Sequence, residues 1–358
     1  MNLRRKSIEM IKKYQHQSGA YVASPNFPTY HYSWLRDGSF IAYGMDRVGE
    51  HESSLAFYRW VHETLLNHEE KARRALDQHR MGKSVGPKEL LHTRYTLEGR
   101  EGQEDWPNFQ LDGYGTWLWG LATHIELTCN RQLLQDLAGS IELTLEYIQE
   151  FWQWDNYDCW EEFGDKKHPS TLACLYGGLK AMERLLGRPE LGQTAAQIRQ
   201  YIIDAFVFEG RVHKFRDLAS VDSNLLWLSL PFGVFEAEDP IMVKTVEEIE
   251  RTLLFDGGGV HRYAQDTYYG GGLWLLLSAW LGWYYTQVGR YEDAKAIRTW
   301  IERQRNANDE LPEQVPNHVN DPDYIQPWVK RWGEVACPLL WSHGMYLVLD
   351  EEIRRGEG

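Results

Sequence analysis

The feature that most constrains the fold of this 358-residue chain is the alternation of two kinds of helical segment along it. In 131–154 and 190–206 apolar residues recur every three or four positions, which predicts helices with one apolar face. Other segments are apolar on nearly every side, which predicts helices that are buried all round; they are 112–127, 170–186, 271–287 and 338–350. This alternation indicates two concentric layers of helices.

The spacing of the segments predicts twelve helices and one architecture. They are expected over 3–17, 37–47, 52–68, 112–127, 131–154, 170–186, 190–206, 222–229, 240–255, 271–287, 290–305 and 338–352. An outer ring of amphipathic helices around a buried inner ring is an all-α (α/α)6 barrel of twelve helices. Glycine and alanine in the buried segments would let neighbouring helices approach closely. No run of Pro, Ser or Gly divides the chain, so we expect a single domain over 1–358.

The connections between these helices alternate in length. The longer ones each follow an outer helix and precede an inner helix, so in a barrel they all emerge at the same end; they are 18–36, 69–111, 155–169, 206–221, 256–270 and 306–337. Function concentrates in long loops on a rigid scaffold. We therefore expect the active site at the N-terminal ends of the inner helices.

Charge and cysteine usage exclude several classes of partner. The net charge of −14 disfavours nucleic acid and anionic membrane surfaces, and the longest apolar stretch, 273–285, is short for a membrane span. The four cysteines form no C-x-x-C pair, and the N-terminal segment has basic residues without an apolar core. We expect a cytoplasmic protein with reduced thiols, no metal and no cofactor.

Aromatic residues and paired carboxylates suggest carbohydrate chemistry. The chain has 16 Trp and 20 Tyr, and aromatic faces stack well on sugars, although a bulky core would also explain these numbers. Acetal hydrolysis needs a proton donor and a second carboxylate, which either activates water or attacks. Glu161 beside Trp160 is the candidate acid, because an apolar neighbour keeps a carboxyl protonated. Glu313, on a different long loop, is the second carboxylate.

Plainer explanations exist for some of these motifs. A W-E-E triplet such as 160–162 occurs by chance on surface helices. Arg36 and Asp37 could form only a helix N-cap and an ion pair, and Asp112 could equally be a helix cap, since Asp is favoured there. The combination of motifs, and not any one of them, therefore carries the functional interpretation.

Taken together and in their order along the chain, the motifs resemble those of the inverting glucoamylase family of glycoside hydrolases, which has an (α/α)6 barrel. The family's W-x-R-D motif is matched by Trp34, Arg36 and Asp37, and its D-x-W-E-E motif by Asp158 to Glu162. Its R-Y motif and the later tryptophan are matched by Arg262, Tyr263 and Trp274. Its E-Q motif is matched by Glu313 and Gln314, and its W-S motif by Trp341 and Ser342. Trp106 is similar to the family's loop tryptophan near the acid.

The resemblance implies a role for each matched residue. Glu161 would be the general acid and Glu313 the base that activates water, roughly 6.5–9.5 Å apart. Substrate would be bound by Trp34, Arg36, Asp37, Trp106, Asp112, Trp160, Glu162, Arg262, Tyr263, Trp274 and Gln314. The implied reaction is exo-acting and inverting, with release of β-glucose from the non-reducing ends of short α-glucosides.

Substrate preference stays open at this point. The additional β-sandwich and starch-binding modules of many relatives have no counterpart here, which favours isomaltose- or maltose-type oligosaccharides over starch. The basic segment 69–100 has no match and could narrow the pocket. Alternatives are an α,α-trehalase of the same family and a non-catalytic sugar-sensing barrel. Retention of both Glu161 and Glu313 argues against the sensing barrel and against a phosphorylase of related fold.

Overall fold

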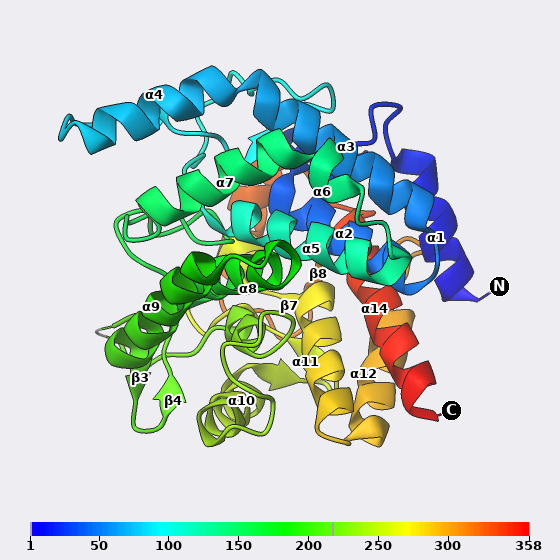
Figure 1. Ribbon diagram of the computed structural model, residues 1–358. Coiled ribbons are helices and arrows are strands. Elements are labelled where there is room, and N and C mark those ends of the chain that lie inside the picture. The colour runs from blue at the N-terminus through cyan, green and yellow to red at the C-terminus, as the bar shows by residue number, and fades with distance from the viewer. Residues whose placement is uncertain (1, 217, 358) are drawn as a thin grey trace.

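Six segments form a closed inner ring in the computed structural model, which describes residues 2–216 and 218–357. They are α2 (Leu35–Arg47), α5 (Asp112–Thr128), α8 (Pro169–Leu186), the 3-10 helix η3 (Ser223–Leu228), α11 (Leu275–Gln287) and α14 (Leu340–Glu357). Each packs against the next, and α14 packs against α2 to close the ring. In Figure 1 the red C-terminal helix accordingly lies beside the blue N-terminal ones.

An outer layer of amphipathic helices covers this ring. It consists of α1 (Leu3–Tyr14), α3 (His51–Asn67), α7 (Ala138–Phe151), α9 (Pro189–Phe206), α10 (Pro240–Leu253) and α12 (Tyr291–Arg303). Each outer helix packs on an inner segment, as α9 does on α8 and α12 does on α11. The predicted all-α (α/α)6 barrel is therefore confirmed.

Glycines let the inner helices approach each other closely, as predicted. A Cβ atom added at Gly44 of α2 would lie 2.5 Å from the carbonyl oxygen of Gly344 in α14. A Cβ atom at Gly178 of α8 would lie 2.5 Å from the carbonyl oxygen of Gly115 in α5. Both distances are far below a van der Waals contact, so the backbones at these two crossings have no room for a side chain.

Two predicted helices differ from those observed. The segment expected to be helical over 222–229 is the six-residue 3-10 helix η3, because Asp222 caps its start and Pro231 cannot continue a helical hydrogen-bond pattern. The segment 131–154 divides into α6 (Leu133–Asp136) and α7, with Leu137 in a non-helical conformation between them.

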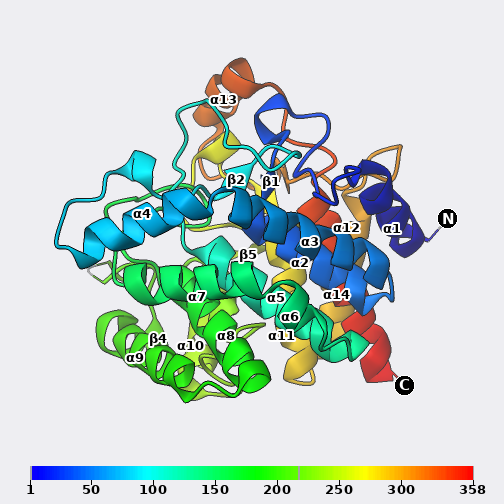
Figure 2. The same ribbon diagram turned by 45° about the horizontal axis from the view of Figure 1, so that its top comes forward.

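Two further helices lie where loops were predicted. The first, α4 (Glu69–Arg80), is strongly polar and is supported by the i,i+4 pairs of Arg73 with Glu69 and Arg74 with Glu70. The second, α13 (Ile325–Trp332), has no buried residue. An apolar stripe was the signal used to find helices. In α4 the buried face is limited to Ala72, Ala75 and Leu76, and in α13 the apolar residues are only partly buried. Figure 2 shows α13, in orange, beyond β1 and β2 and apart from the rings.

Two-residue strands connect the long loops. β1 (Ser33–Trp34) pairs with β2 (Arg94–Tyr95), and β3 (Val207–Phe208) pairs with β4 (Arg211–Val212). A four-stranded sheet has the order β5 (Leu254–Phe255), β6 (Gly259–Val260), β7 (Leu273–Trp274) and β8 (Gln314–Val315). β7 occupies residues that were predicted to begin a helix. These pairings fix β1, β7 and β8 next to the starts of α2 and α11.

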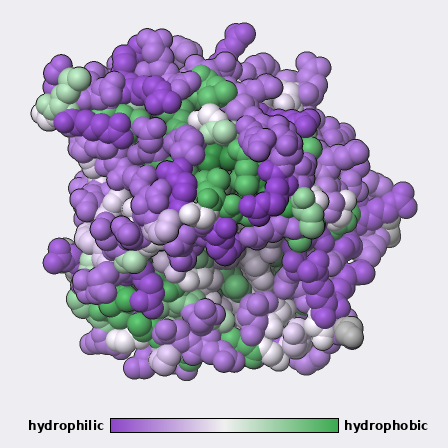
Figure 3. Space-filling model, viewed as in Figure 1, coloured by the Kyte–Doolittle hydropathy of each residue, from purple (hydrophilic) through white to green (hydrophobic). Residues whose placement is uncertain are grey.

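The surface is mainly hydrophilic in the view of Figure 3, with a smaller apolar area near the centre. The large aromatic residues lie mostly inside: Trp117, Trp227 and Trp280 are fully buried. Among the described helices, none combines the length and the hydropathy that a membrane-crossing segment requires.

We predict that Gly44→Ala lowers the free energy of unfolding by about 1–3 kcal/mol, because the added methyl group forces α2 and α14 apart. The control is Gly192→Ala in α9, where the nearest atom is the flexible carboxylate end of Glu183. Alanine favours a helix, so the control should be neutral or slightly stabilising. Urea unfolding of both variants measures the difference, and equal effects would contradict the close-packing argument.

Candidate active site

A pocket with a volume of about 280 Å³ opens at the N-terminal ends of the inner helices. Its walls come from five of the six predicted long loops, and the exception is 206–221. The lining residues are Ala23, Tyr30, Trp34, Arg36, Asp37, Asp105, Trp106, Pro107, Cys159, Trp160, Glu161, Glu162, Arg262, Tyr268, Trp274, Glu313, Trp328, Arg331, Trp332, Leu339 and Trp341. The predicted Asp112, Tyr263 and Gln314 lie outside this lining.

Glu161 lies in a tight turn with one carboxylate oxygen already bound. Its φ of 68° is in the left-handed region, and its N–H donates to the carbonyl oxygen of Asp158 at 2.9 Å. Its Oε1 accepts hydrogen bonds from the indole N–H groups of Trp34 at 2.7 Å and Trp106 at 2.9 Å. Burial raises the pKa of Glu161, while the charge of Arg36 and the two indole donors oppose the rise.

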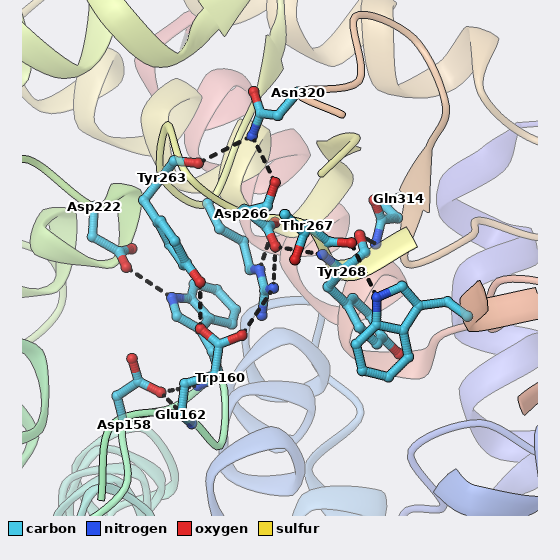
Figure 4. A network of polar contacts seen from close by, with 12 residues as sticks. Asp158, Trp160, Glu162, Asp222, Tyr263, Asp266, Thr267, Tyr268, Gln314 and Asn320 are labelled. Atoms are coloured by element: carbon cyan, nitrogen blue, oxygen red, sulfur yellow. Dashed lines mark hydrogen bonds and ion pairs between the residues drawn. The ribbon is translucent and has the colours of Figure 1, made fainter. Parts of the chain in front are cut away.

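A buried ion cluster supports this turn from behind. Oδ1 of Asp158 accepts from the backbone N–H groups of Trp160 at 3.0 Å and Glu162 at 2.9 Å. Asp222 accepts from the indole N–H of Trp160 at 2.9 Å, as Figure 4 shows. The ammonium of Lys214 contacts both Asp158, at 3.3 Å, and Asp222, and all three charged residues are almost completely buried.

Glu313 lies across the pocket lining on a separate loop, directly before β8. It is 3% exposed, and its Oε2 has no hydrogen-bond partner among the described residues. Burial raises the pKa of Glu313 to about 8, while the charge of Arg262 and the hydroxyls of Tyr30 and Tyr268 lower it. Because Glu313 lines the pocket, its carboxyl group faces the space that a ligand or a water molecule would occupy.

The first turn of α2 places a second set of charges in the pocket. Arg36 donates to Asp37 at 3.1 Å, and its Nη1 contacts Asp112 at 3.0 Å and the side-chain oxygen of Gln110 at 2.9 Å. Burial raises the pKa of Asp37 to about 7 against the neighbouring Arg36 charge. Neither aspartate is an N-cap, since α2 begins after Trp34 and α5 begins at Asp112 itself. Asp112 reaches the site only through Arg36.

A third set of charges surrounds Arg262. Its guanidinium forms a two-pronged ion pair with Asp266 and lies 3.5 Å from Glu162. Tyr263 donates its hydroxyl to the other oxygen of Glu162, so its side chain supports that residue from outside the lining (Figure 4). Burial raises the pKa of Glu162, and the charge of Arg262 opposes the rise. Trp160 and Trp274 pack at 5.3 Å between ring centroids beside this group.

Gln314 connects loops and does not line the pocket. Its side-chain oxygen accepts from the N–H of Gly272 at 2.8 Å, and its amide nitrogen donates to the carbonyl oxygen of Tyr268 at 3.1 Å. Because β8 also pairs with β7, these bonds hold the residue after Glu313 against the start of α11. The direct substrate contact expected of Gln314 stays a prediction.

The sequence argument assigned no role to several of the residues that shape the site. Tyr30 and Tyr268 hydrogen-bond through their hydroxyls at 2.7 Å beside Glu313, and Asp266 pairs with Arg262. Asp266 could have been found as a carboxylate four positions after Arg262. Lys214 and Asp222 lie in a non-periodic segment, where no local pattern indicates a buried ion pair.

Among the described residues, one group of side chains could geometrically hold a metal ion, and it lies at the opposite ends of the inner helices from the pocket. It consists of Asp46, His51 and His124, near the C-terminal ends of α2 and α5. Asp46 already forms hydrogen bonds of 2.9 Å with His51 and 3.0 Å with His124. Its polar atoms therefore satisfy one another.

The double ring of helices presents two carboxyl groups, buried arginines and aromatic walls at one end, which is the arrangement expected of a glycoside hydrolase. The sequence model of the Glycosyl hydrolases family 15 matches residues 3–315. The chain belongs to this family, which confirms the predicted enzyme class and the resemblance.

Individual relatives extend over nearly the whole chain. An isomaltose glucohydrolase of Kribbella flavida is 39% identical over 98% of this chain and 92% of its own length. A glycosidase variant solved in complex with glucose superposes with a TM-score of 0.95 at 38% identity, and the match covers 98% of this chain and 96% of that one. A bacterial glucoamylase complexed with acarbose, 19% identical, shares the fold with a TM-score of 0.79 over 99% of this chain and 55% of that one.

We predict that Lys214→Met lowers the free energy of unfolding by about 3–5 kcal/mol, because it leaves Asp158 and Asp222 buried without their cation. The control is Lys167→Met, which removes a partly exposed pair with Asp155 and should cost at most about 1 kcal/mol. Chemical denaturation measures both values. A loss below 1 kcal/mol for Lys214→Met would contradict the supporting role of the cluster.

Proposed function

We propose that this exo-acting α-glucosidase hydrolyses short, isomaltose-type α-glucosides with inversion, with Glu161 as general acid and Glu313 as general base. The observation that carries the proposal is that these two carboxyls, from loops far apart in the sequence, line one pocket. The arginine and aspartate side chains of the family motifs line the same pocket.

The hydrogen bonds of Glu161 suit a proton donor. Both indole N–H groups bind Oε1, so Oε2 is the oxygen that carries the proton to the glycosidic oxygen. Burial raises the pKa of Glu161 and so favours the protonated form that an acid needs. When the proton leaves, the developing charge on the carboxylate is stabilised by two donors that are already in place.

Glu313 suits the removal of a proton from water. Its carboxyl group lines the pocket, and in the ionised form it accepts a proton from a water molecule that attacks the anomeric carbon. With a pKa of about 8, only a minor fraction of Glu313 is ionised at neutral pH in the empty pocket. The Tyr30 and Tyr268 hydroxyls lower this pKa and so enlarge the active fraction.

The non-reducing glucose is bound by charged groups that are already paired with one another. Arg36 and Asp37 on one side and Arg262 on the other offer charge-assisted hydrogen bonds to sugar hydroxyls. Trp34, Trp160 and Trp274 are apolar walls for the faces of the ring. Because the arginines are held by Asp112 and Asp266, their geometry exists before the substrate binds.

Two observations favour a short substrate and, within short substrates, isomaltose. The pocket of about 280 Å³ lies at the lower end of the sizes of small-molecule sites, which suits a disaccharide better than a polymer. The relative that matches 98% of the chain is an isomaltose glucohydrolase. Maltose-type linkages and trehalose are the competing substrates of the same two carboxyls.

We also propose a cytoplasmic location and a single catalytic domain over 1–358. The four cysteines, Cys129, Cys159, Cys174 and Cys337, are free thiols, which suits a reducing compartment. The domain proposal is supported by α14, which packs against both α1 and α2 and so joins the two ends of the chain in one barrel.

We predict that Glu161→Gln and Glu313→Gln each lower kcat for isomaltose by at least about 100-fold, because each removes one proton transfer. Proton NMR within minutes of mixing should show β-glucose released by the unsubstituted enzyme from isomaltose. The control is Glu104→Gln, a carboxylate on the same loop as Trp106 that lies outside the lining and should retain activity. α-Glucose as the first product would contradict the role of Glu313, and turnover of trehalose alone would favour a trehalase.

We predict that Tyr268→Phe lowers kcat/KM mainly on the acidic side of the pH profile. Loss of this hydroxyl raises the pKa of Glu313, so the ionised fraction at a given acidic pH falls about tenfold for each unit of rise. As the pH rises above the pKa of Glu313 in the variant, the base becomes ionised in both enzymes, so the difference should shrink. The control is Tyr269→Phe, which removes a neighbouring hydroxyl that donates to the carbonyl oxygen of Gly333 and should leave the shape of the pH profile unchanged. A uniform loss at all pH values would contradict the effect on Glu313.

A further inference from the structure

The short helix α13 presents one face to the mouth of the pocket. Arg331 and Trp332 follow Trp328 by three and four positions, so both are neighbours of Trp328 on the helix surface. All three line the pocket, whereas the exposed Lys330 of the same helix does not. No residue of α13 is buried, so this helix adds little to the core.

Aromatic contacts nevertheless hold α13 in a defined place. The indole N–H of Trp328 donates to the carbonyl oxygen of Thr267 at 3.0 Å, and its ring lies 5.0 Å from that of Tyr268. Tyr269 donates its hydroxyl to the carbonyl oxygen of Gly333, the residue that ends the helix, at 2.8 Å. The face of α13 is thus fixed relative to the catalytic loops.

This face lies on the leaving-group side of the acid. The ring of Trp106, which donates to Glu161, stacks on Trp332 at 6.1 Å between centroids and an interplanar angle of 29°. The general acid must reach the oxygen that joins the two sugars, so its outer neighbours face the sugar that leaves. Arg36 and Arg262, by contrast, are 3% exposed and belong to the deep part of the pocket.

Arg331 differs from the other two arginines of the lining. Arg36 and Arg262 are paired with carboxylates, whereas among residues 2–216 and 218–357 no carboxylate or carbonyl oxygen accepts a hydrogen bond from Arg331. Its guanidinium lies against aromatic rings, 4.7 Å from the centroid of Trp332 and 5.3 Å from that of Trp328. Its N–H groups are therefore free to bind the hydroxyls of a ligand that stacks on the same wall.

We propose that α13 forms the binding site for the leaving sugar, with Trp332 and Trp106 as its stacking wall and Arg331 as the hydrogen-bond donor that selects a sugar aglycone. This inference rests on the proposed α-glucosidase function and names the part of the chain that recognises the second sugar. Sugar rings offer an apolar face and a rim of hydroxyls, which is the pattern that an indole beside a guanidinium complements.

The test compares two substrates that differ only in the leaving group. Isomaltose leaves a sugar, whereas α-glucosyl fluoride leaves a fluoride ion that has no ring or hydroxyl for α13 to bind. In Arg331→Gln the ratio of kcat/KM for isomaltose to that for α-glucosyl fluoride should fall by about 10- to 100-fold, the loss expected for a charge-assisted hydrogen bond. If the unsubstituted enzyme prefers maltose, the same ratio is measured with maltose.

The control is Lys330→Gln, which removes a neighbouring charge of the same helix outside the lining and should leave the ratio unchanged. An unchanged ratio in Arg331→Gln, or an equal fall in Lys330→Gln, would overturn the role of Arg331. Failure of the unsubstituted enzyme to cleave any α-linked disaccharide would instead contradict the proposed function. The two failures are therefore distinguishable in one set of assays.

Discussion

The whole structure depends on the close approach of the inner helices at glycine. The crossings of Gly44 with Gly344 and of α5 with α8 have no room for a Cβ atom, so the ring can close at a small radius. Closure aligns the starts of the inner helices at one end. The loops that precede them must then converge there, and this convergence brings Glu161 and Glu313 into one pocket although about 150 residues separate them in the chain.

The charged side chains of the site are buried away from water, and they are paired with opposite charges in clusters. Arg36 and Arg262 each contact carboxylates that are themselves buried, and Lys214 lies between Asp158 and Asp222. A buried charge without a partner would be strongly unfavourable. The paired groups keep a fixed orientation, so the transition state meets dipoles and charges that need no rearrangement. Burial raises the pKa values of Glu161 and Glu313, the proposed acid and base, and also that of Asp37 despite its pairing with Arg36.

The long helices and the location of the site could be predicted because burial imposes periodicity and barrel closure imposes convergence. The motifs around Glu161 and Glu313 could be recognised in the sequence because each lies in one of the long loops, and these loops converge at the pocket. The pattern predicted a helix at η3 but not its 3-10 form. It missed α4, whose buried face is only Ala72, Ala75 and Leu76, and α13, which has no buried residue. Nor could it reveal the partner of Lys214, since that pairing depends on tertiary contact.

The site thus combines a deep part, which is buried in the core, and an outer part, which lies near the surface. The deep part of the pocket is formed at the first turns of the inner helices, so a substitution of Arg36 or Asp112 disturbs an ion pair inside the core. The outer part, α13, has no buried residue and is held by a few aromatic contacts and backbone hydrogen bonds. Substitutions at its exposed positions, such as Lys330 and Arg331, cost little stability. The proposed recognition of the leaving sugar can therefore vary on α13 while the proposed glucose-binding and proton-transferring groups stay fixed.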